Sequence, residues 1–168
     1  MKYSLLILTV LGTLQLAVAQ PAQIILIRHA EKPADPAALH LSKKGRERAK
    51  GLVPFLTNNP VLTQHGAPVA LYAAHPTKHG HGQRTQETIA PLAEALHLPV
   101  ETPYLAEAYA GLAKSILTNP KYLGKTVLIC WVHEYIPQFA AVLGVSLTSP
   151  IFFRKPSKNR CFTKICSK

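Results

Sequence analysis

The sequence QIILIRHAEKP (residues 23–33) joins a short apolar run directly to an arginine and a histidine. Consecutive β-branched and apolar residues over 23–27 predict a buried strand. A second run of this kind, KTVLICW (residues 125–131), is followed two residues later by His133. In α/β folds functional side chains gather at the carboxyl ends of the strands. The sequence therefore predicts that His29 and His133, with Arg28 beside them, lie together at one edge of a sheet.

Helical patterns separate the predicted strands. Residues 69–73 predict a third strand, and apolar spacing predicts helices over residues 41–56, 84–96, 105–117 and 135–143. Ser42 is the expected N-cap of the first of these helices. Pro91 is expected near a first turn or at a kink. This alternation predicts an α/β fold of three layers, with a mostly parallel sheet flanked by helices.

The first residues, MKYSLLILTVLGTLQLAVAQ, have the layout of a secretory signal. A basic Lys2 precedes an apolar stretch, and Ala17-Val18-Ala19 forms a small-x-small cleavage site. The apolar stretch is too short to span a bilayer comfortably, and no other segment is long and apolar enough. We therefore expect a signal peptide over residues 1–19, a secreted or periplasmic mature chain, and no stable membrane insertion.

The chain is strongly basic, with a formal net charge of +11. The last eighteen residues contain six cations and no acid, namely Arg154, Lys155, Lys158, Arg160, Lys164 and Lys168. Nucleic acid, an anionic surface or an anionic substrate could each exploit such charge. The sequence contains no nucleic-acid-binding motif, so we expect no specific nucleic-acid partner.

The three cysteines fall into two groups. Cys130 lies inside an apolar run and is predicted to be a buried, inert thiol. Cys161 and Cys166 could form a small local disulfide in an oxidising compartment, although spacing alone does not establish the pair.

Four segments in order, LIRHAEKP, LSKKGRERA, RTQET and VLICWVHEYIPQFAAVLG, resemble the signature segments of the histidine phosphatase superfamily. That group includes phosphoglycerate mutases, acid phosphatases and phytases. The resemblance spans about residues 23–145 and implies a phosphoglycerate mutase-like domain over residues 20–150. It also implies a metal-independent phosphomonoester hydrolase that needs no cofactor, takes a small phosphorylated substrate and forms a phosphohistidine at His29. Ala30 replaces the more usual glycine, a variant that also occurs in the family.

The chemistry of these residues agrees with that role. A neutral histidine nitrogen can attack phosphorus and carry the phosphoryl group, which divides hydrolysis into two easier steps. Nearby cations disfavour protonation of His29 and also bind phosphate oxygens. Arg28, Arg84 and Lys32 are the candidates for this phosphate-binding role, and His133 would donate a further hydrogen bond.

The proton donor for the leaving group has two candidates. Glu134 follows His133 and resembles the His-Asp pair of the acid phosphatase branch. Glu107 resembles the acid of the mutase branch, which the surrounding chain matches more closely, so it is slightly favoured. Glu134 could equally be a solvated residue at a helix N-terminus. Glu31 is closer to His29 in sequence but points elsewhere in related motifs.

Two segments lie outside this pattern. His75, His79 and His81 could bind a transition metal, but no cysteine or carboxylate joins them, so we expect a loop at the mouth of the pocket and no metal site. Residues 151–168 form a basic tail unlike the strand expected there: a genuine tail, a disulfide-closed hook, or a frameshifted or truncated reading frame. A missing strand would leave an exposed sheet edge.

The contrasting function is that of a catalytically impaired phosphatase-fold protein, which would bind an anion or, through the histidine-rich loop, a metal. The sequence leaves the identity of the substrate and the oligomeric state open.

Overall fold

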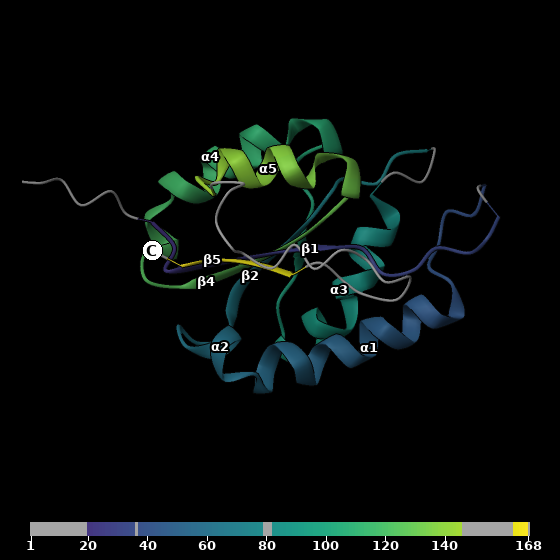
Figure 1. The fold of residues 1–168 in the computed structure, drawn as a ribbon, viewed down its shortest axis with the longest axis horizontal. Coiled ribbons are helices and arrows are strands. Elements are labelled where there is room, and N and C mark those ends of the chain that lie inside the picture. The colour runs from purple at the N-terminus through teal and green to yellow at the C-terminus, as the bar shows by residue number, and fades with distance from the viewer. Residues whose placement is uncertain (1–19, 36, 79–81, 146–162, 168) are drawn as a thin grey trace, which may run out of the picture.

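A computed structural model describes residues 20–35, 37–78, 82–145 and 163–167 of the chain. Its strands form one sheet in the order β3-β2-β4-β1-β5 (Figure 1). Strands β1 to β4 run parallel to one another, and β5 runs antiparallel to β1. The prediction of a mostly parallel sheet is therefore confirmed. The strand bounds are Gln23–Arg28 (β1), Pro68–Ala73 (β2), Val100–Glu101 (β3), Thr126–Trp131 (β4) and Thr163–Ser167 (β5).

The four predicted helices are present, with small shifts at their ends. The α-helices are α1 (Lys43–Asn58), α2 (Pro60–Thr63), α3 (Gln83–Leu96), α4 (Tyr109–Thr118) and α5 (Ile136–Val142). Three 3₁₀ turns accompany them: η1 (Ala106–Ala108), η2 (Pro120–Tyr122) and η3 (His133–Tyr135). Ser42 caps α1 by accepting from the Gly45 N–H, as expected. Pro91 lies in the interior of α3, which excludes the first turn as its position and leaves the kink as the remaining expectation.

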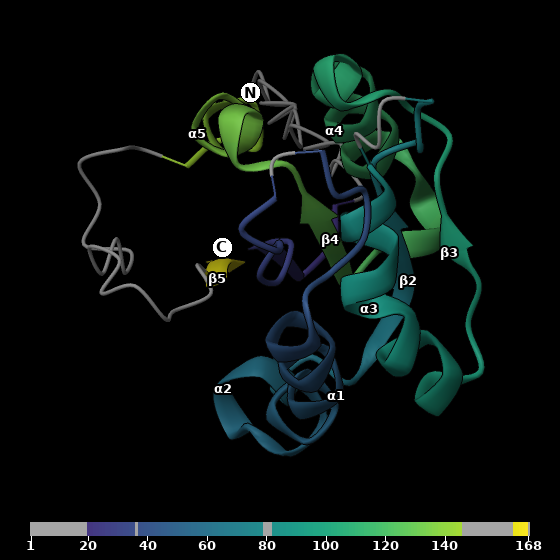
Figure 2. The same ribbon diagram turned by 90° about the vertical axis from the view of Figure 1, so that its right-hand side faces the viewer.

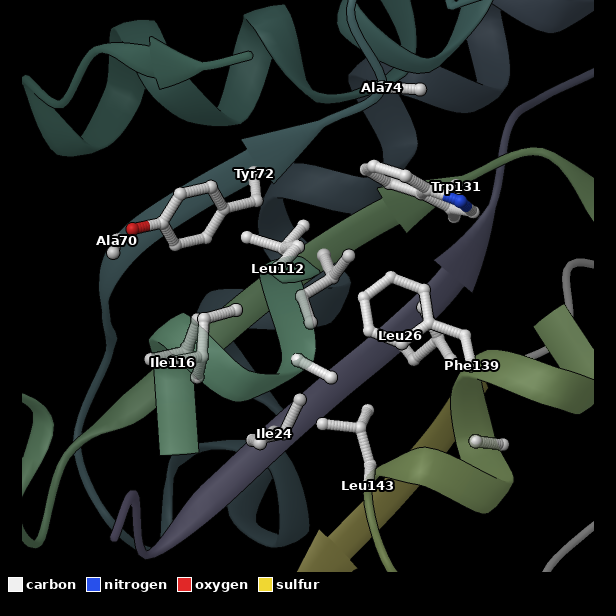
Figure 3. Packing of buried hydrophobic residues seen from close by; sticks show 14 of the residues in the cluster. Ile24, Leu26, Ala70, Tyr72, Ala74, Leu112, Ile116, Trp131, Phe139 and Leu143 are labelled. Carbon is white, nitrogen blue, oxygen red and sulfur yellow. The ribbon is translucent and has the colours of Figure 1, made fainter. Parts of the chain in front are cut away.

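Helices cover both faces of the sheet, with α4 and α5 on one side and α1, α2 and α3 on the other (Figure 1). Successive residues of a strand point to opposite faces. Ile24 and Leu26 therefore pack with Leu112 and Phe139 of the upper helices (Figure 3). Ile25 and Ile27 pack instead against the lower helices. Because both faces of β1 and β4 are buried, their sequences are continuously apolar and do not alternate.

The parallel register of β1 and β4 sets the position of the histidines. Arg28 pairs with Trp131, so both strands end at the same edge of the sheet. From there the chain continues from β1 toward α1 on one face and from β4 into α5 on the other (Figure 2). Such a divergence between neighbouring strands is the usual place for a ligand site in an open α/β sheet.

The basic tail contributes a strand that the sequence did not predict. Residues Thr163–Ser167 pair with β1 from Gln23 to Ile27, and β5 forms one edge of the sheet (Figure 2). The missing strand that the sequence left open as a possibility is therefore not observed. Five residues without a clear apolar run give little signal, because an edge strand is defined by its backbone pairing more than by burial. The stub expected at residues 151–153 lies outside the described residues.

Two other expectations concern single features. Cys130 is fully buried in β4, as predicted. The proposed partner of Cys166, Cys161, lies outside the described residues, as does the expected signal peptide. Within the residues that are described, no helix has the length and apolar character needed to cross a membrane.

The start of α1 lies against the loop that follows β1. The Ser42 N–H and hydroxyl both donate to the Glu31 carbonyl, at 2.9 and 3.1 Å. A Cβ atom at Gly45 would lie 2.3 Å from that same carbonyl oxygen. Glycine at this position therefore allows the helix to approach the backbone two residues after His29.

We predict that Gly45→Ala lowers the free energy of unfolding by about 1–3 kcal/mol, because the added methyl group meets backbone that cannot move aside cheaply. Gly51→Ala on the same helix is the matched control, since a Cβ there meets nothing within 4 Å. The control should gain about 0.5–1 kcal/mol from helix propensity. Urea unfolding measures both variants, and equal stability of the two would contradict the packing argument.

Candidate active site

One ring nitrogen of His29 is hydrogen-bonded to the backbone, and the other is available for chemistry. Its backbone N–H donates to the Trp131 carbonyl at 3.3 Å, which extends the β1–β4 pairing by one residue. The ring is buried, with 6% exposure, and its Nδ1 lies 2.7 Å from the Ala30 carbonyl oxygen. A carbonyl oxygen only accepts, so Nδ1 carries the proton. In the neutral ring Nε2 then has the free lone pair.

The surroundings of His29 keep the ring neutral. The pKa of His29 is lowered to about 4: burial is the largest cause, the hydrogen bond to Ala30 acts in the opposite direction, and the charges of Arg28 and Arg84 also lower the pKa. A buried imidazole beside two guanidinium groups loses hydration and gains repulsion when it takes a proton. At neutral pH His29 is consequently an unprotonated base inside a positively charged environment.

His133 stands beside His29 at the end of the neighbouring strand. The two ring centroids are 6.2 Å apart and the rings are nearly perpendicular. Its side chain is about half exposed. Partial burial lowers the pKa of His133, the charges of Arg28, Lys32 and Arg84 act in the same direction, and Glu134 opposes them. Three cations thus act on this histidine, and two of them also act on His29.

Arg84 comes from the first turn of α3 and has one committed nitrogen. Its Nη1 donates to the Ala38 carbonyl at 2.7 Å, which fixes the guanidinium across the loop that follows β1. Its Nε is buried and has no hydrogen-bond partner. A buried donor without an acceptor costs about 1–3 kcal/mol. An oxygen of a bound anion would satisfy this N–H.

Thr88, one turn after Arg84, ties α3 to the histidine loop. Its hydroxyl accepts from the Ala30 N–H at 2.8 Å and donates to the Arg84 carbonyl at 2.7 Å. The Arg-x-x-x-Thr spacing therefore has a structural reason, because a single helix supplies a cation and the anchor of the residue after His29.

A second attachment between α3 and the same loop was not predicted. Glu87 accepts from the Leu41 N–H at 2.8 Å, and its carboxylate also contacts Nδ1 of His40 within hydrogen-bond distance. Partial burial acts to raise the pKa of Glu87, but these contacts and one from Gln83 hold it below its usual value. In the sequence, Glu87 is the acid three positions after Arg84 in RTQET. Nothing in the sequence connects this acid to residues 40–41.

The acidic residues near His29 have different surroundings. Glu31 forms an ion pair with Arg48 of α1. Glu134 is exposed, and its carboxylate lies 3.8 Å from Nε2 of His133. Glu107 is exposed in η1, where the preceding residue, Ala106, accepts a 2.9 Å hydrogen bond from the Trp131 indole. Both candidate proton donors therefore lie on turns attached to the end of β4.

The histidine-rich loop is described only in part. His75 directs Nδ1 to the Thr102 carbonyl at 2.9 Å, whereas His79 and His81 lie outside the described residues. Over the part of the chain that the structure covers, no three histidine, cysteine or acidic side chains are grouped to hold a metal ion.

No family model matches this chain, and no curated protein matches it significantly. Any function proposed for this chain therefore rests on its own sequence and on the geometry of the site.

The low pKa of His29 predicts a specific dependence of stability on pH. The unfolded chain, with a histidine pKa near 6.5, binds more protons than the folded chain between pH 6.5 and about 4. The contribution of neutral His29 is present above pH 6.5 and is lost as the pH falls to 4, by about 3 kcal/mol. Urea unfolding across this range should show a shallower loss for His29→Gln. The exposed His65→Gln should follow the wild type, and equal slopes for all three proteins would refute the assignment.

Proposed function

We propose that this chain is a histidine phosphatase with a phosphoglycerate mutase-like fold, exported to act on a small phosphomonoester without a metal ion or cofactor. The observation that carries the proposal is the state of His29: a buried, neutral imidazole whose Nδ1 is bound to Ala30 and whose Nε2 is available beside two arginines. A phosphoryl acceptor requires a neutral nitrogen next to cations that bind the transferring group. The four ordered segments that resemble the histidine phosphatase superfamily also support it.

In the first step, the Nε2 lone pair of His29 forms a bond to phosphorus as the bond to the leaving oxygen breaks. Arg28, Arg84 and Lys32 bind the phosphoryl oxygens, and the unpaired Nε of Arg84 provides a donor that no protein group occupies. His133 donates to another of these oxygens. Such preorganised donors stabilise charge that spreads over the phosphoryl group in the transition state.

A carboxylic acid, Glu107 or Glu134, gives its proton to the leaving oxygen. In the second step water attacks the phosphorus of phospho-His29, the N–P bond breaks, and the water's proton passes to the same carboxylate. The enzyme returns to its starting state and inorganic phosphate leaves. Nδ1–H keeps its bond to Ala30 throughout, so the ring does not need to change its tautomer.

We predict that the mature chain hydrolyses an aryl phosphate in the presence of a chelator and that His29→Ala lowers kcat by at least about 10³-fold, since the nucleophile is removed. His65→Ala is the matched control, because His65 is exposed. Stopped reactions analysed by mass spectrometry should show one phosphoryl group on the peptide that contains His29. A folded wild-type protein without activity, or a fully active His29→Ala, would refute the proposal and favour an anion-binding protein.

The two candidate acids make different predictions. Removing the true proton donor should lower kcat by about 10²–10⁴-fold for an alkyl phosphate, whose leaving group needs a proton. The loss should be much smaller for a nitrophenyl phosphate, whose leaving group departs as an anion. Glu107→Gln and Glu134→Gln are each assayed with both substrates. The variant with the selective loss identifies the donor, and a loss independent of the leaving group in both would exclude both carboxylates.

A further inference from the structure

A pocket of about 190 Å³ lies at the opposite end of the sheet from His29 and His133. It is formed where β2 and β3 begin, beside the turn η2. Its lining combines an apolar surface with one acid and one base, comprising Val69, Ala70, Leu98, Pro99, Glu101, Lys121 and Tyr122. None of these residues belongs to the candidate active site.

The opening results from an irregularity in the strands. The pairing of β2 with β4 shifts between Pro68 and Ala70, and Val69 is left with 42% exposure. On its other side β2 pairs with β3 only from Leu71 to Tyr72. Among the described strands, the beginning of β2 therefore has no neighbour on this side, and an apolar surface faces the space. Where an irregular strand begins beside a strand of only two residues, the edge of the sheet has room for a ligand.

The floor of the pocket is formed by Tyr122, which pairs with Tyr72. Tyr122 is 2% exposed, and its hydroxyl lies 2.6 Å from the hydroxyl of Tyr72. The two rings meet nearly edge to face. Figure 3 shows the Tyr72 hydroxyl directed along β2 toward Ala70, which lines the pocket. A buried, mutually bonded tyrosine pair holds the apolar floor in one position.

The rim carries two charges of opposite sign. Lys121 and Glu101 are exposed, and within the described part of the chain neither forms an ion pair. Nζ of Lys121 lies 4.8 Å from the centre of the Tyr122 ring, directly above the floor. Both charges act on the Tyr72 hydroxyl, which places them around the same tyrosine pair. An apolar floor with an unpaired cation and an unpaired anion at its rim is complementary to a zwitterion with an apolar body.

We propose that this pocket binds a small zwitterion with an apolar side chain, of the class formed by free apolar amino acids and short apolar peptides. Its carboxylate pairs with Lys121, its ammonium group pairs with Glu101, and its side chain contacts Val69, Leu98 and Pro99. The inference does not depend on the phosphatase proposal, because the pocket lies where the strands begin and the histidines lie where they end.

Backbone-amide NMR titration of the mature chain with leucine and with leucyl-leucine tests the proposal. We expect saturable shifts at Val69, Ala70 and Tyr122 for at least one probe, with a dissociation constant of about 1 mM or tighter. N-acetyl-leucine lacks the ammonium group and leucinamide lacks the carboxylate, so each should bind at least about tenfold more weakly. Tighter binding of leucine or of the dipeptide would identify the source of the zwitterion, and either result supports the site.

Lys121→Met and Glu101→Gln should each weaken binding of the better probe at least about tenfold. Lys125→Met is the matched control: it removes a nearby exposed lysine that does not line the pocket, and should leave binding unchanged. The proposal is overturned if no probe gives saturable shifts at these residues. Equal binding of the blocked probes, or unchanged binding by both rim variants, overturns it as well, because the charges would then play no part.

Discussion

The parallel pairing of β1 with β4 is the interaction on which the candidate active site depends. Each residue from Gln23 to Arg28 has a partner in β4, and the His29 N–H adds one more bond to the Trp131 carbonyl. Both faces of β1 are covered by helices, with Ile24 and Leu26 packed in one core and Ile25 and Ile27 in the other, so a shift of the strand would disturb the packing of both cores. The two histidines meet because two strands of equal length end together, without any contact between the rings being needed to bring them there.

Beyond the strand ends, the chain must bury several backbone groups in a loop. Side chains and caps from the helices satisfy them: Thr88 accepts from the Ala30 N–H, and Ser42 donates to the Glu31 carbonyl. Buried polar groups without such partners are costly. The residues that shape the site are consequently small polar ones and a glycine, Gly45, whose missing side chain lets α1 approach. In the proposed reaction these residues act indirectly, because they fix the position of His29.

The sequence predicted the sheet type, the helices and the meeting of His29 with His133, because these follow from local patterns and from one rule about strand ends. It did not predict the attachment of Glu87 to His40 and Leu41, since that contact joins residues 46 positions apart whose pairing leaves no periodic signal. The strand β5 was not predicted for a related reason. A short edge strand forms because the open side of β1 offers backbone hydrogen-bond partners, and its own sequence needs no apolar pattern. Tertiary contacts between polar side chains are the features of the structure that a single sequence does not predict.

Burial and charge act on His29 and His133 to different degrees, and this difference divides their proposed roles. His29 is almost fully buried, so the loss of hydration dominates and its nitrogen stays unprotonated well below neutral pH. His133 is half exposed and has Glu134 nearby, which opposes the effect of the cations on its pKa. A bound phosphate dianion would neutralise part of the positive charge around both rings, and the more solvated ring with an adjacent carboxylate is the one that takes up a proton more readily. In the proposed mechanism, the same site thus keeps His29 as a nucleophile while allowing His133 to become a cationic donor when a phosphorylated substrate binds.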